Sequence, residues 1–291
     1  MEKIHLLMSS DNNYVQHLGV TLISVFENTE VPDNFHVTVL DGGIFPEQKN
    51  LLKGIAQKYD AAINFREVKL DNPEKFIVNG HVSIAAYYRV LLPLIYGPEV
   101  RKAIYLDCDV IVNHDLNELF KVDLNGFVVG AVKELSNKRM VELGFPDKPY
   151  FNSGVLLINY QEWLEQNTTQ EVLDFIFANP EKLVYWDQDA LNACLVDKWM
   201  ELDYQWNYLR EFVEINKNWK NRKKFIPHIV HFSNNTKPWH YYSRNPYDYL
   251  YYKYLGLSPW KGFHPLGKNF RKVVAKNVKL TLREGGILKG M

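Results

Sequence analysis

The stretch "YLDCDVIV", residues 105–112, places two aspartates inside an apolar run that is otherwise typical of a buried β-strand. Side chains two positions apart on an extended strand project to the same face, so Asp107 and Asp109 are expected to lie side by side. A buried ionised carboxylate must be paired, hydrogen-bonded or bound to a metal. If the strand ends here, both carboxylates can reach one divalent cation, and their hard oxygens suit Mg²⁺ or Mn²⁺.

The same two aspartates could instead be ordinary acids at a strand end that form salt bridges or cap the next helix. That helix has its own predicted cap, because Asp115 and Glu118 in "DLNE" have the spacing of a capping box. A D-x-D pair also occurs in phosphatases of the haloacid-dehalogenase type, which need a later lysine and acid pair after another strand. The later acids, in "YWDQDAL" (185–191), follow no apolar strand run. The phosphatase alternative is therefore disfavoured but stays open at this point.

On both sides of this stretch, apolar strands alternate with segments of helical periodicity. Strands are predicted at 3–8, 35–41, 62–68, 127–132 and 154–159, and helices at 13–29, 46–59, 83–92, 160–179 and 187–197. This alternation predicts an α/β fold in which helices cover both faces of a mostly parallel sheet. Residues 1–240 are expected to form this domain, and the aromatic and basic residues 241–291 a small C-terminal helical subdomain.

Composition narrows the function classes. The 291 residues contain 34 basic and 34 acidic side chains, so the chain as a whole shows no electrostatic sign of a nucleic-acid partner. Two cysteines exclude a disulfide framework and suit a reducing compartment. The N-terminal apolar run is too short for a signal peptide or a membrane span, so a cytoplasmic location is expected.

The basic tail, residues 261–291, could contact a membrane. Its segment "NFRKVVAKNVKLTLREGG" has apolar residues at helical spacing among many bases, which fits peripheral binding to anionic lipid on the inner face of the cell membrane. The competing interpretation is that these apolar residues pack on the core of the protein itself.

Further candidate site residues follow predicted strands, where ligands of open parallel sheets collect. The segment "MSSDNNY" (8–14) has no glycine, which disfavours a dinucleotide fingerprint. Asp11, Asn13 and Tyr14 could hold a base and its ribose, although Asp11 could simply cap the next helix. In "IVHFSNNTKPWH" (229–240), His231 could ligate the same cation and Lys237 could contact a diphosphate.

Six segments of the chain occur in the order found in glycosyltransferase family 8, which the chain resembles over about residues 3–240. They are "SSDNNY" (9–14), "HVSIAAYYR" (81–89), "YLDCDVIV", "YFNSGVLLIN" (150–159), "DQDALN" (187–192) and "HFSNNTKPW" (231–239). The family includes bacterial lipooligosaccharide galactosyltransferases and glycogenin. The resemblance implies the nucleotide-sugar-binding fold called GT-A, a UDP-hexose donor, Mn²⁺ as cofactor and retention of anomeric configuration.

The resemblance also implies a role for individual residues. Metal ligands would be Asp107, Asp109 and His231, and donor-binding residues would be Ser9, Asp11, Asn13, Tyr14, His81, Arg89, Asn152 and Lys237. Gln188 and Asp187 would be catalytic, with Gln188 near the reacting face of the anomeric carbon. Two departures stand out: Asn234 replaces the usual glycine of the H-x-x-G-x-x-K-P-W loop, and Glu134 stands where close relatives often have Asp.

These expectations together describe a metal-dependent retaining transferase. It would move glucose or galactose from UDP-glucose or UDP-galactose to a hydroxyl of a saccharide, glycolipid or glycoprotein acceptor. Two alternatives remain from the sequence, namely a haloacid-dehalogenase-like phosphatase that forms an aspartyl-phosphate at Asp107, and a module that binds a nucleotide sugar without turning it over.

Overall fold

The computed structural model describes residues 2–68, 76, 84–92, 95–97, 99–215, 225–233 and 235–265. Its centre is a seven-stranded sheet with the strand order β3–β2–β1–β4–β7–β6–β8. The strands are β1 (Ile4–Ser10), β2 (Phe35–Asp41), β3 (Ala62–Glu67), β4 (Lys102–Leu106), β6 (Val129–Lys133), β7 (Phe151–Asn159) and β8 (Trp199–Glu201). Two further strands, β5 (Val110–Val112) and β9 (Ile229–His231), form a separate ribbon.

Strand direction in the main sheet is mostly parallel. β1 pairs in parallel with β2 and β4, β2 with β3, and β6 with β8. Only β7 runs the other way, antiparallel to both β4 and β6. The predicted mostly parallel α/β sheet is therefore confirmed.

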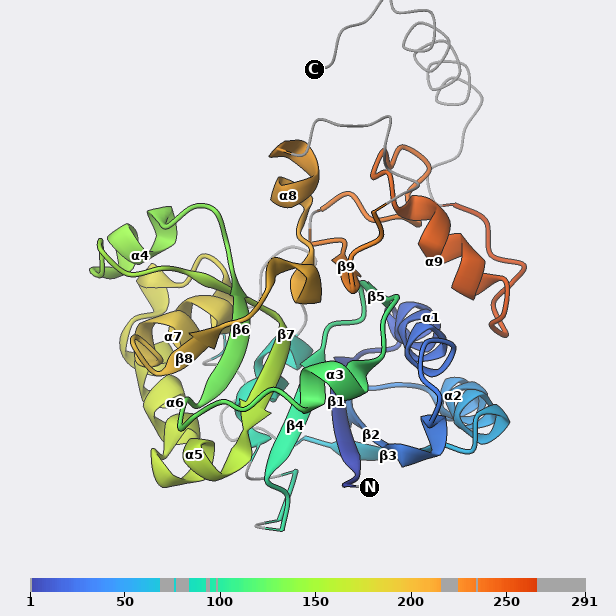
Figure 1. The fold of residues 1–291 in the computed structure, drawn as a ribbon, viewed down its shortest axis with the longest axis horizontal. Coiled ribbons are helices and arrows are strands. Elements are labelled where there is room, and N and C mark those ends of the chain that lie inside the picture. Colours follow the sequence, from blue (N-terminus) through green and yellow to red (C-terminus); the bar gives the residue numbers. More distant parts are fainter. Residues whose placement is uncertain are drawn as a thin grey trace, which may run out of the picture.

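Helices cover both faces of this sheet, with α1, α2 and α9 on one side and α5, α6 and α7 on the other (Figure 1). Neighbouring residues of one strand supply both cores, since Leu6 belongs to the cluster that includes α1 and Leu7 to the cluster on the opposite face. The α-helices are α1 (Val15–Phe26), α2 (Pro46–Lys58), α3 (Leu116–Phe120), α4 (Lys138–Leu143), α5 (Tyr160–Glu165), α6 (Thr168–Ala178), α7 (Trp186–Cys194), α8 (Arg210–Ile215) and α9 (Asp248–Leu255).

The apolar run around the two aspartates does not form one strand, so the prediction of a shared strand face is wrong. β4 ends at Leu106, and β5 leaves the main sheet to pair antiparallel with β9. The Thr21 hydroxyl lies 3.0 Å from the Cys108 carbonyl oxygen and 2.8 Å from that of Val110, so it satisfies carbonyls at the break. Asp107 and Asp109 consequently occupy the turn where the chain passes from one sheet to the other.

Two predicted helices also differ from the structure. The segment 160–179 is divided into α5 and α6, because Asn167 between them adopts a left-handed backbone with φ 49°. The segment predicted at 83–92 contains the 3₁₀ helix Ile84–Val90.

The C-terminal aromatic residues pack on the main domain. Tyr251 and Tyr254 of α9 are buried in the same core as α1, and the Trp260 indole donates to Gln48 of α2 at 3.2 Å. These rings are thus explained by packing within the protein. The segment 266–291, which carries the predicted basic amphipathic helix, lies outside the described residues, and the boundary at residue 240 stays a prediction. No helix within the described ranges is long and apolar enough to cross a membrane.

Candidate metal and nucleotide-sugar site

Three predicted metal ligands converge at the ribbon. Asp107, Asp109 and His231 each offer a ligand atom within 4.8 Å of the others. The β5–β9 pairing sets Val110 opposite His231, and the Phe232 amide donates to the Asp109 carbonyl at 3.0 Å. As a result, His231 Nε2 lies 3.3 Å from Asp109 Oδ1 and 4.0 Å from Asp107 Oδ2.

The space beside these ligands fits a divalent cation. Two carboxylates and one imidazole form a donor set that suits Mn²⁺ or Mg²⁺. Gly154 of β7 forms the wall, and a Cβ added there would lie 2.6 Å from Asp107 Oδ2 and would overlap the His231 ring. A residue without a side chain is therefore required where the ligands meet.

Lys237 lies beside the same ligands. Its Nζ forms an ion pair with Asp109 and donates to the Phe232 carbonyl at 2.8 Å. Burial disfavours the ionised form of Asp109, but Lys237 and His231 hold the pKa of that carboxyl well below its usual range. The lysine predicted to contact a diphosphate is thus next to the candidate metal centre.

Arg89 connects a metal ligand to a predicted catalytic acid. Its Nη2 lies 3.0 Å from Asp107 Oδ1, its Nε 2.9 Å from Asp187 Oδ2, and its Nη1 donates to the Ser153 carbonyl at 2.6 Å. Burial opposes its charge, yet the two carboxylates raise the pKa of Arg89 further above its usual value. Burial raises the pKa of Asp187 to about 7, and Arg89 counteracts that rise. These are buried ion pairs, since the Arg89 side chain is only 7% exposed.

Gln188, at the start of α7, is held by polar groups of three residues. Its Oε1 accepts from the Ser153 amide at 3.0 Å and from Asn152 Nδ2 at 3.1 Å. Its Nε2 donates to Glu134 Oε1 at 3.1 Å, and the same oxygen accepts from Asn152 Nδ2 at 3.2 Å. Burial raises the pKa of Glu134. The longer carboxylate noted in the sequence thus contacts both predicted sugar-binding amides.

The N-terminal candidates lie at the carboxyl end of β1. Asp11 Oδ1 accepts from the amides of Asn13 at 2.9 Å and Tyr14 at 3.1 Å, so it stabilises the turn before α1. The alternative that Asp11 caps this helix is wrong, because the N-cap of α1 is Tyr14 and no described side chain caps it. The Tyr14 ring meets Trp239 edge-on with the ring centres 5.9 Å apart. Burial, with Asp109 as the next cause, raises the pKa of Tyr14 to about 12.

Ser9 is linked to the candidate metal ligand Asp107 through the Tyr105 hydroxyl. Its Oγ lies 3.4 Å from the Tyr105 hydroxyl, which donates to Asp107 Oδ1 at 2.8 Å. His81 and Asn234 lie outside the described residues, so their predicted roles stay predictions.

The chain matches the family described as glycosyl transferase family 8 over residues 5–243. It belongs to this family. The match spans all of the described site, and family membership leaves the phosphatase alternative without support.

Relatives of this family 8 chain include a lipopolysaccharide glucosyltransferase. It is 35% identical to general stress protein A of Bacillus subtilis over 89% of this chain and 95% of the relative. It is 27% identical to a lipopolysaccharide 1,2-glucosyltransferase of Escherichia coli K12 over 91% of this chain and 81% of the relative. A solved galactosyltransferase, LgtC in complex with donor and acceptor sugar analogues, is 25% identical with a TM-score of 0.76, over 89% of this chain and 99% of that one. This likeness and the sheet order establish the predicted GT-A architecture.

One buried residue of this family 8 site was missed by sequence reasoning. Asn207, at the end of the 3₁₀ helix Tyr204–Asn207, donates through Nδ2 to Asn152 Oδ1 at 2.9 Å and contacts His231 Nδ1 through Oδ1 at 2.9 Å. A single asparagine in "YQWNYL" carries no motif. Its place becomes visible only because Tyr208 bridges to Val230 beside β9.

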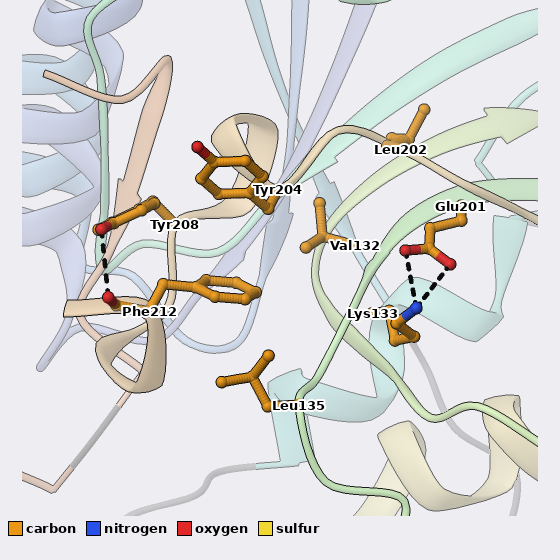
Figure 2. A pocket seen from close by; sticks show the side chains of 8 residues that line it. All are labelled: Val132, Lys133, Leu135, Glu201, Leu202, Tyr204, Tyr208 and Phe212. Carbon is orange, nitrogen blue, oxygen red and sulfur yellow. Dashed lines mark hydrogen bonds and ion pairs between the residues drawn. The ribbon is translucent and has the colours of Figure 1, made fainter. Parts of the chain in front are cut away.

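A pocket of about 520 Å³ adjoins the strand end that carries Glu134 (Figure 2). Most of its wall is apolar or aromatic, and the ion pair between Lys133 and Glu201 closes one side at 3.0 Å. Glu134 lies in sequence between two lining residues, so the same short segment serves both the pocket and the polar site. The lining residues are Val132, Lys133, Leu135, Glu201, Leu202, Tyr204, Tyr208 and Phe212.

Proposed function

We propose that this chain is a metal-dependent retaining hexosyltransferase that uses UDP-glucose or UDP-galactose. The acceptor is a hydroxyl of a saccharide, glycolipid or glycoprotein. The observation that carries the proposal is the convergence of Asp107, Asp109 and His231 with Lys237 at one point. The glucosyltransferase and galactosyltransferase among the similar proteins support both hexoses.

The cation is proposed to be Mn²⁺, or Mg²⁺, held by Asp107, Asp109 and His231. When bound, it supplies positive charge to the diphosphate of the leaving UDP. Lys237 adds a second positive charge from the protein, within reach of the same ligands. Tyr14, with Asp11 and Asn13 in the preceding turn, is proposed to contact the uridine.

The hexose is proposed to lie against Gln188, Asn152 and Asp187. The Gln188 carbonyl oxygen is held in place by the Ser153 amide and Asn152, so its dipole is fixed before any substrate binds. An amide is a poor nucleophile, and front-face attack by the acceptor hydroxyl therefore fits this site better than a covalent glycosyl-enzyme. Arg89 keeps Asp107 and Asp187 in fixed positions.

The test is a screen of UDP-sugars with Mn²⁺, in which UDP release is measured with and without saccharide acceptors. We expect turnover of UDP-glucose or UDP-galactose and an α-anomer in the early product by NMR. Asp109→Asn should abolish Mn²⁺-dependent UDP binding in calorimetry, whereas Asp123→Asn at an exposed turn should bind as the wild type does. Unchanged UDP affinity in Asp109→Asn, or a β-product, would contradict the assignment, whereas UDP binding with no turnover of any sugar would favour the binding-module alternative.

A further inference from the structure

We infer that Asn207 is a positioning residue that keeps a proton on His231 Nδ1 and so directs Nε2 toward Asp107 and Asp109 as the ligand nitrogen. This inference rests on the proposed metal site. It concerns a relay of side-chain amides, Gln188, Asn152 and Asn207, whose orientation can be deduced from backbone groups alone.

Two backbone amides fix the first part of the relay. The Gly154 N–H can only donate, so the Asn152 atom that it meets at 3.0 Å must be Oδ1. The Ser153 N–H likewise requires Gln188 Oε1 at its 3.0 Å contact. That oxygen in turn requires a donor at 3.1 Å, which is Asn152 Nδ2. Both backbone groups therefore give the same orientation for Asn152.

The orientation of the Asn152 amide determines that of Asn207, and Asn207 in turn determines which nitrogen of His231 carries a hydrogen. Asn152 Oδ1 needs a donor from Asn207 at 2.9 Å, so that atom is Nδ2. The remaining amide atom of Asn207 is Oδ1, which accepts only, and it lies 2.9 Å from His231 Nδ1. His231 Nδ1 therefore carries a hydrogen, and the Nε2 atom, 3.3 Å from Asp109 Oδ1, is the nitrogen that can coordinate a metal.

Burial of the three side chains keeps these amide orientations fixed. Asn207 is fully buried, Asn152 is 7% exposed and His231 is 3% exposed, so water cannot replace a lost partner. Turning the Asn207 amide over would set two donors against each other at His231 and two acceptors against each other at Asn152. The protein thus selects the ligand nitrogen before the cation arrives.

The direct measurement is ¹⁵N NMR of the metal-free, full-length chain labelled at its nine histidines, at pH 8. His231 signals are assigned by their loss in His231→Ala. We expect a protonated Nδ1 in the wild type. An unprotonated Nδ1 would overturn the inference, and this result needs no variant of Asn207 to fold.

Two substitutions test the role of Asn207. Asn207→Leu should lose the preference for the Nδ1–H form and bind Mn²⁺ alone about 10–100-fold more weakly in calorimetry. Asn207→Asp keeps an oxygen acceptor toward Nδ1, so it should keep the Nδ1–H signal and bind Mn²⁺ more tightly than Asn207→Leu. The control is Asn34→Leu, which removes another buried amide that bonds to the Glu2 carbonyl far from the site and should change neither readout.

The outcomes separate this inference from the proposed function. If Asn207→Leu keeps wild-type Mn²⁺ affinity and the Nδ1–H form, the role of Asn207 is wrong while the transferase assignment stands. If the wild type binds no Mn²⁺, the metal centre itself is wrong, and the ligand role of Nε2 fails with it.

Discussion

At the scale of single residues, the site depends on the missing side chain of one glycine as well as on its polar groups. Gly154 leaves room for His231 and Asp107, and Thr21 supplies a hydroxyl where the strand breaks. Sequence motifs predicted the candidate metal ligands, Arg89 and Gln188, and the structure places them at one site; acids, bases and amides in a known order are informative. They could not identify Asn207 or Thr21, since these roles arise only when distant backbone segments meet.

Gly154→Ala tests the first of these residues. The added methyl overlaps His231 and crowds Asp107, so we expect weaker Mn²⁺ binding and a loss of roughly 1–3 kcal/mol in the free energy of unfolding. Calorimetry and thermal unfolding measure the two effects. Gly54→Ala is the matched control, because Gly54 is an exposed position of α2 and nothing lies within 4 Å of the added Cβ. This variant should keep Mn²⁺ binding and gain up to about 1 kcal/mol, since alanine favours a helix over glycine. Wild-type Mn²⁺ affinity in Gly154→Ala would show that the ligands do not need this space.

At the scale of elements, α1 and α9 are joined through a buried histidine. His17 stacks on Trp239 with the ring centres 3.4 Å apart, and its Nδ1 lies 2.7 Å from the Tyr251 hydroxyl. Burial lowers the pKa of His17 to about 3. The periodicity of 13–29 predicted a helix here but could not show that its one histidine faces inward, because the partners are more than two hundred residues away.

The sequence also misplaced two element boundaries for physical reasons. Apolar residues continue on both sides of Asp107 and Asp109, so hydrophobic pattern alone joins β4 to β5. In the same way, apolar spacing continues across Asn167, although its left-handed backbone separates α5 from α6.

The pH dependence of stability follows from His17. The unfolded chain binds a proton near pH 6.5 and the folded chain only near pH 3, so this contribution is complete above pH 6.5 and is lost as the pH falls. Between pH 6.5 and 5 we expect a loss of roughly 2 kcal/mol in the wild type. His17→Phe should lack this part of the slope in urea unfolding, and Gln16 would still bond to the Tyr251 hydroxyl. The exposed His264→Phe serves as control, and equal slopes in all three proteins would contradict a buried neutral His17.

At the scale of the whole molecule, residues 241–265 and the sheet share one core. Alternation of strands and helices was enough to predict the architecture, because central strands such as β1 carry apolar residues on both faces. The aromatic stretch before the tail was less informative, since Tyr251 and Tyr254 face the core while Tyr249 is 51% exposed. We propose that the basic tail beyond these rings brings the enzyme to the inner face of the membrane, near a lipid-linked acceptor.

Truncation after Pro265 tests the tail while it keeps Trp260 on Gln48 and Phe263 on the core. The shortened protein should bind UDP with Mn²⁺ nearly as the full chain does, but sediment less with anionic liposomes, because it loses seven of the eight basic residues in segment 261–291. Liposomes of neutral lipid serve as control, since neither protein should sediment with them. Equal sedimentation of both proteins with anionic liposomes would exclude a membrane role for residues 266–291.

The ribbon of β5 and β9 also has a consequence for the order of folding. Asp109 and Lys237 lie 128 residues apart in the chain, and they meet only when this pairing closes a very long loop. Contacts of such separation form late, after local helices and neighbouring strands. A growing chain that has not yet exposed β9 therefore lacks His231 and Lys237, and its capacity to bind a cation would report that β5 and β9 have paired.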